Sequence, residues 1–126
     1  MNWKRYTLAD MDCDLADKKC VPCLGGVPPL PGEEQKKLLQ RLDGWALNGA
    51  GHLTKTYAYA GFRRGLEFVK AVGEMCEEQG HHGDLHLAWG KTRLEVWTHK
   101  IGGLVEADFV WAAKADRLWA ALPKDL

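Results

Sequence analysis

The chain has no excess of charge of either sign. Its 126 residues include 17 Lys and Arg and 17 Asp and Glu, so the formal net charge is zero. A balanced chain lacks the basic footprint with which proteins bind nucleic acid, so we expect no direct nucleic-acid partner. A surface without net charge also tends to self-associate, which favours an oligomer.

Long apolar runs are missing as well. No stretch approaches the ~20 apolar residues that a bilayer span needs. Residues 1–6 contain a basic pair, but the apolar segment of a signal peptide does not follow it. We therefore expect no membrane role and predict a cytoplasmic protein. In that reducing compartment its four cysteines are thiols or metal ligands rather than disulfides.

The first 31 residues differ from the rest of the chain. They hold Cys13, Cys20 and Cys23 and end in a proline cluster at 28–31, with little helix or strand periodicity. We interpret residues 1–31 as an irregular arm that is dispensable for folding, and 32–126 as the compact domain. The Cys20-x-x-Cys23 motif lacks a preceding βαβ pattern for a redox role, and zinc would need further ligands. The arm is therefore predicted to hold no metal.

The remaining sequence alternates between helical and strand periodicity. Helices are predicted over 33–42, 62–79 and 105–122, and strands over 45–47, 52–59, 85–89 and 92–99. Short turns within each strand pair indicate two antiparallel hairpins. The order α-β-β-α-β-β-α predicts an α+β fold, with a four-stranded antiparallel sheet and three helices on one face. The other face of the sheet is left available for a site.

The helix predicted over 62–79 is apolar over more than one stripe. Phe68, Val72 and Met75 form one stripe, and a second includes Leu66 and Val69. Together they are wider than one core contact needs, which predicts packing against another subunit in a homodimer or homotetramer.

Histidines and carboxylates cluster around the predicted element ends. His81 and His82 follow the long helix, and Glu77 lies one turn before His81 on the same helix face. His99 ends the clearest strand, and Asp108 lies in the first turn of the last helix. Several histidines in one site can perform both acid and base steps near neutral pH.

Each of these residues also has an ordinary structural interpretation. A histidine pair after a helix is commonly a solvated end, and Asp108 occupies the position of a capping-box acid if Val105 is the N-cap. Three histidines could instead bind zinc. Adjacent His81 and His82 do not easily point at one metal ion, however, so no metal site is predicted.

Together these residues form an ordered pattern. From about 32 to 122, roughly three quarters of the chain, the sequence resembles the pterin-4a-carbinolamine dehydratase family. The resemblance is carried by Gly44-Trp45, Tyr57-x-Tyr59, Phe62, Glu77, His81-His82, Trp89, Thr98-His99, Gly102-Gly103-Leu104 and Asp108, at the family's spacing. The chain departs from the family at Gly83, where Pro is usual, and at Leu85, where Trp is usual.

The resemblance implies a hydro-lyase that needs no cofactor and acts on a pterin. The implied reaction dehydrates a 4a-hydroxytetrahydropterin, such as 4a-hydroxytetrahydrobiopterin, to quinonoid dihydropterin for recycling. It implies that His81, His82 and His99 are catalytic. Glu77 and Asp108 would orient or charge the imidazoles, and Trp89 would pack near the flat ring.

Two other functions fit the same residues. The chain could be a non-catalytic dimerisation module that uses the long helix as its interface. It could also be an enzyme that acts on a molybdopterin-type pterin. A pure binding module has no need for His81, His82, His99 and Asp108 together, which favours the dehydratase.

Overall fold

The computed structural model describes residues 15–18 and 28–126. In chain order its labelled elements are α2 (Gly32–Leu39), β1 (Ala46–Leu47), β2 (Leu53–Ala58), α3 (Arg63–Gln79), β3 (Asp84–Ala88), β4 (Lys91–Val96) and α4 (Glu106–Ala121). The α-β-β-α-β-β-α order predicted from the periodicity is confirmed, with each boundary within three residues of its predicted place.

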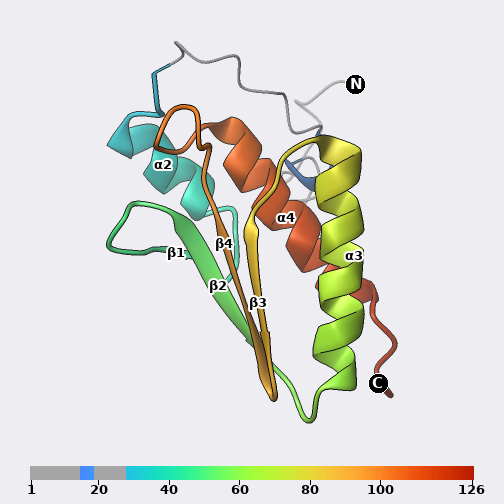
Figure 1. Cartoon of the computed structure of the whole chain (residues 1–126). Helices are drawn as coiled ribbons and strands as arrows, with labels where there is room; N and C mark the ends of the chain where they lie inside the picture. The colour runs from blue at the N-terminus through green and yellow to red at the C-terminus, as the bar shows by residue number, and fades with distance from the viewer. Residues whose placement is uncertain (1–14, 19–27) are drawn as a thin grey trace, which may run out of the picture.

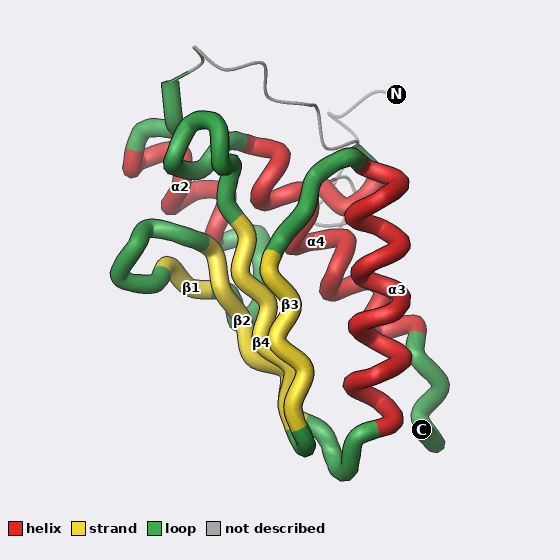
Figure 2. Tube along the Cα trace, in the orientation of Figure 1, coloured by secondary structure: helices red, strands yellow, loops and turns green. Residues whose placement is uncertain are grey.

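The four strands form one antiparallel sheet in the order β1-β2-β4-β3. Both hairpins are present, and they join along β2 and β4, where Leu53 lies opposite Val96. Figures 1 and 2 show the sheet on one side of the molecule, with α3 and α4 on its other side and α2 near one end of α4. The predicted α+β class is confirmed, and the opposite face of the sheet carries no described helix.

The core lies between the sheet and the helices. Alternation along β4 buries Thr92, Leu94 and Val96 and turns Glu95 and Trp97 toward the open face, as predicted. From the helices, side chains such as Phe68 of α3 and Phe109 and Trp111 of α4 complete the core.

One predicted strand ends early. The pattern predicts a strand over 92–99, but β4 stops at Val96, and Thr98 makes an isolated bridge to Gly103. The loop closes because the amides of Ile101 and Gly102 both donate to the Thr98 carbonyl, with Gly102 at a φ of 70°. His99 therefore lies in this loop, just beyond the sheet.

The described part of the arm packs on the domain. Residues 15–17 are helical, and Leu15 and Ala16 are buried. The Lys114 Nζ donates to the Ala16 carbonyl at 2.6 Å, and Arg117 pairs with Asp17 at 2.6 Å. These residues are therefore helical rather than irregular, and Leu15 belongs to the core. That the domain folds without the arm stays a prediction. The boundary at 31 stays a prediction, and Cys13, Cys20 and Cys23 lie outside the described residues.

Among the described residues, no helix has the length and apolar character to cross a membrane. The cytoplasmic location stays a prediction.

Candidate active site

A pocket of about 290 Å³ opens where α3 ends and β4 passes into its following loop. It is lined by Gly80, His81, His82, Trp97, Thr98, His99 and Lys100. The two ends of the β3–β4 hairpin meet here, because β4 runs antiparallel to β3 and returns the chain to the end of α3. The fold thus brings together the three histidines predicted from the sequence.

His81 is paired with a buried carboxylate. Its Nε2 lies 2.7 Å from Oδ1 of Asp108, which is fully buried. The other oxygen of Asp108 accepts the Thr98 hydroxyl at 2.8 Å and the Val105 amide at 2.9 Å. Val105 is the N-cap of α4, so Asp108 also caps this helix, as its spacing indicated. As a carboxylate it can only accept hydrogen bonds, so His81 must donate from Nε2.

His82 has a different partner. Its Nε2 lies 2.5 Å from Oε2 of Glu77, and both side chains are largely exposed. The spacing placed Glu77 with His81 on one helix face, but the structure pairs it with His82. The reason is Gly80, whose φ of 65° ends α3 in the left-handed conformation and redirects the next residues.

His99 has no hydrogen-bond partner for its ring among the described residues. Its imidazole instead stacks on the indole of Trp97, with ring centroids 4.3 Å apart and planes 6° apart. Trp97 was not singled out as a site residue from the sequence. The alternation that placed it on one face with His99 could have identified it, because residues two apart on a strand are neighbours.

Trp89 lies away from this pocket. It is 76% exposed in the turn between β3 and β4, at the end of the hairpin opposite His82. The six residue steps from Gly83 to Trp89 span roughly 20 Å at strand spacing. Within one chain, Trp89 therefore cannot pack beside a pterin held among the three histidines.

The loop that carries the histidine pair rests on Trp111. The Trp111 indole Nε1 donates to the His81 carbonyl at 3.0 Å. A Cβ on Gly83 would lie 2.8 Å from the same indole and 2.9 Å from the Glu95 carbonyl oxygen. Gly83 therefore leaves the space that the Trp111 indole fills.

We expect Gly83→Ala to destabilise the domain by about 1–3 kcal/mol, because the added methyl overpacks a rigid contact. Chemical denaturation measures the change. Gly73→Ala in α3 is the control, since no neighbouring atom lies within 4 Å of the place that its new methyl group would take, and a helix interior favours Ala over Gly. A Gly83→Ala protein as stable as the wild type would contradict the packing argument.

The open face of the sheet carries a second polar group beside the pocket. Glu95 of β4 accepts His52 at 2.7 Å and Asn48 at 2.9 Å on one oxygen, and Arg93 at 3.0 Å on the other. These hydrogen bonds, that from His52 first and then that from Asn48, lower the pKa of Glu95 to about 2.

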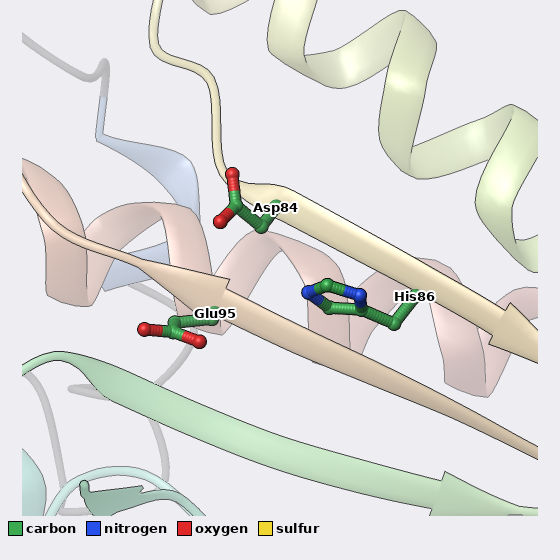
Figure 3. Close-up of side chains that lie close together, drawn as sticks. All are labelled: Asp84, His86 and Glu95. Carbon is green, nitrogen blue, oxygen red and sulfur yellow. The ribbon is translucent and has the colours of Figure 1, made fainter. Parts of the chain in front are cut away.

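Asp84 and His86 lie next to Glu95 on this face, and Figure 3 shows the three side chains together. Their candidate ligand atoms all lie within 4.8 Å of one another. Both oxygens of Glu95 already accept hydrogen bonds, so a metal ion would have to displace them. We therefore interpret Glu95 as the anchor of His52 and propose no metal centre here.

Glu95 should make the free energy of unfolding depend on pH in the acid range. A carboxyl with a lowered folded-state pKa stabilises the fold fully above its ordinary pKa of 4.5, and this contribution is lost as the pH falls toward about 2. We expect Glu95→Gln to lower the free energy of unfolding by about 1–3 kcal/mol at pH 7. The difference should shrink between pH 4.5 and 2.5 in urea titrations. A difference that is constant with pH would show that the carboxylate charge is not responsible.

The fold recurs in a known crystal structure. A transcriptional coactivator/pterin dehydratase from Brucella melitensis superimposes with a TM-score of 0.68 and 24% sequence identity. The alignment covers 71% of this chain and 97% of the Brucella chain. The architecture is therefore that of a known α+β fold.

Sequence comparison identifies the family. The model of the pterin 4 alpha carbinolamine dehydratase family matches residues 28–118. A relative from Rubrobacter xylanophilus is 52% identical, with 83% of this chain and 98% of the relative aligned. Another from Rickettsia bellii is 49% identical, with 84% and 95% aligned. Both relatives are provisionally named pterin-4-alpha-carbinolamine dehydratases. The chain belongs to the pterin-4a-carbinolamine dehydratase family.

Proposed function

We propose that the protein dehydrates a 4a-hydroxytetrahydropterin to quinonoid dihydropterin by histidine acid–base catalysis. The observation that carries the proposal is the convergence of His81, His82 and His99 on one pocket. Two of these imidazoles are held by carboxylates, so a substrate in the pocket would meet several oriented copies of the side chain best suited to proton transfer near neutral pH.

The reaction requires two proton transfers. One acid protonates the 4a-hydroxyl, which leaves as water when its bond to the ring carbon breaks. A base removes the proton of the adjacent ring nitrogen, whose electrons form the new C=N bond. No oxidant or reductant is consumed. Imidazoles that reach one pocket from two segments of the chain suit this pair of steps, because each must lie within hydrogen-bond reach of its atom.

Within this scheme the roles of the histidines differ by environment. His81 donates to buried Asp108, which holds the orientation of its ring. His82 is more exposed, and so is its carboxylate partner, Glu77. His99 has no carboxylate partner and is the candidate base. These assignments rest on the geometry around each ring.

A stopped-flow assay tests the function. Purified protein is mixed with freshly formed 4a-hydroxytetrahydrobiopterin, and the quinonoid product is followed by absorbance. We expect dehydration well above the buffer rate, and unchanged by a chelator, because the proposed steps need only proton transfer. A rate no faster than buffer would contradict the proposal, as would activity lost with chelator and restored with zinc. A molybdopterin-type pterin serves as the comparison substrate.

We also propose that the chain forms a homodimer or homotetramer through α3. Phe68, Val72 and Met75 face the core, while Leu66 and Val69 on the neighbouring stripe are only partly covered. Light scattering should give a mass at least twice the 14.1 kDa of one chain. Glutamate at both Leu66 and Val69 should shift the mass toward that of the monomer. A wild type that is monomeric at micromolar concentration would contradict the proposal.

A further inference from the structure

Three flat rings are stacked along the open face of the sheet. His52 lies against the Trp97 indole, with centroids 3.9 Å apart and planes 4° apart. His99 stacks on the same indole, with centroids 4.3 Å apart and planes 6° apart. The stack crosses from β2 to β4, because Leu53 pairs with Val96 and brings the preceding residue beside Trp97.

The stack has one anchored end and one end at the pocket. His52 is held by Glu95 at 2.7 Å, and its backbone amide donates to the Asn48 side chain at 3.0 Å. Its side chain is only 15% exposed. His99 is exposed and lines the pocket with Trp97, whereas His52 lies outside the pocket lining.

The ring of His99 is held by fewer contacts than the rings of His81 and His82. His81 and His82 each have a carboxylate within hydrogen-bond distance. Among the described residues, the ring of His99 makes no hydrogen bond, and its only ring contact is Trp97. A side chain held by stacking alone loses its orientation when the ring beneath it can move.

We propose that His52 is a positioning residue for His99, acting through Trp97. Glu95 fixes the imidazole of His52, the imidazole fixes the plane of the indole, and the indole holds the ring of His99 toward the pocket. Each of the three pocket histidines is then supported by a carboxylate: His81 by Asp108, His82 by Glu77, and His99 indirectly by Glu95.

The kinetic consequence rests on the proposed dehydratase function, but the structural one does not. His52→Leu removes the flat ring and its hydrogen bond, while His52→Phe keeps a flat ring over Trp97. Thr56→Ala is the matched control, because Thr56 lies on the same strand and face, outside the stack.

The experiment combines steady-state kinetics with NMR of the histidine ring protons. We expect His52→Leu to lower kcat roughly two- to tenfold, the weight of one aromatic pair, with KM nearly unchanged. His52→Phe should recover only part of the lost kcat, because it keeps the flat ring over Trp97 but loses the hydrogen bond to Glu95. Thr56→Ala should not change kcat. The ring-proton signals of His99, assigned by their loss in His99→Ala, should move toward free-histidine positions in His52→Leu only.

The outcomes separate the two proposals. If the wild type is inactive on the pterin but the His99 signals still move in His52→Leu, the proposed function fails and the positioning role stands. If His52→Leu keeps both the wild-type kcat and the wild-type His99 signals, the positioning role is overturned. Equal losses in His52→Phe and His52→Leu would also overturn it, because stacking would not be the cause. If His52→Leu does not fold, His52→Gln replaces it, since Gln also lacks the ring.

Discussion

Replacing His82 with alanine should lower the dehydration rate about 10²–10⁴-fold, the range for loss of one acid–base group. The melting temperature should hardly change, because 59% of the His82 side chain is exposed and its one partner, Glu77, is exposed as well. A large loss of turnover without a loss of stability is the signature of a residue that acts on the substrate.

The same substitution at the other two histidines should lower turnover comparably. His99→Ala removes an exposed ring and should leave the fold intact. His81→Ala also leaves Oδ1 of buried Asp108 without its hydrogen-bond partner and should cost stability. The losses need not multiply when the substitutions are combined, because residues that act as a unit are non-additive.

His86→Ala is the control for these variants. His86 is an exposed histidine on β3, outside the pocket lining, so its loss should leave turnover at the wild-type value. Stopped-flow rates and thermal melts of all four proteins check the expectation. Wild-type turnover in the His81, His82 and His99 variants would show that the pocket histidines do not catalyse the reaction.

Local periodicity predicted the elements well because each side chain's burial follows from its own strand or helix. The alternation of Thr92, Leu94 and Val96 against Glu95 and Trp97 is a property of one segment, and the structure confirms it. The order of the strands is different. The pairing of β2 with β4 joins segments separated by the whole of α3, and no local pattern specifies it.

The membership of the pocket was predictable, but its pairing was not. The family resemblance singled out His81, His82, His99 and Asp108, and the structure brings them to one end of the sheet. The pairing of carboxylates with histidines depends on Gly80, whose left-handed conformation ends α3. Because of it, Glu77 pairs with His82 instead of His81. Helical spacing predicts which side chains are neighbours only within the helix, and His81 and His82 lie beyond its end.

The stack on the open face was hidden for a similar reason. His52 and Trp97 are 45 positions apart and meet only through the register of β2 and β4. Trp89 shows the converse, because its place in the family pattern indicated a site residue, yet the hairpin carries it to the opposite end of the sheet. Sequence order constrains such contacts only after the sheet is assembled.

Asp108→Asn should separate the two roles of the buried carboxylate. Asparagine has nearly the same shape, and its single carbonyl can still accept the Thr98 hydroxyl and the Val105 amide. Its amide nitrogen must then face His81 and donate to Nε2, which reverses the direction of the 2.7 Å hydrogen bond. To accept this hydrogen bond, His81 would have to carry its ring proton on Nδ1 instead of Nε2.

We therefore expect Asp108→Asn to remain folded, with a loss of about 1–2 kcal/mol, while turnover falls roughly 10²–10⁴-fold. Asp108→Ala should lose both turnover and stability, because three donors are left without their acceptor. We expect it to be destabilised by about 3–5 kcal/mol. Thr92→Val is the stability control. It removes a buried hydroxyl of β4 that hydrogen-bonds the Tyr59 hydroxyl, and Thr92 lies outside the pocket lining. This variant should lower stability without lowering turnover. Denaturation and stopped-flow rates on the same samples decide the matter, and wild-type turnover in Asp108→Asn would show that the charge on Asp108 does not govern His81.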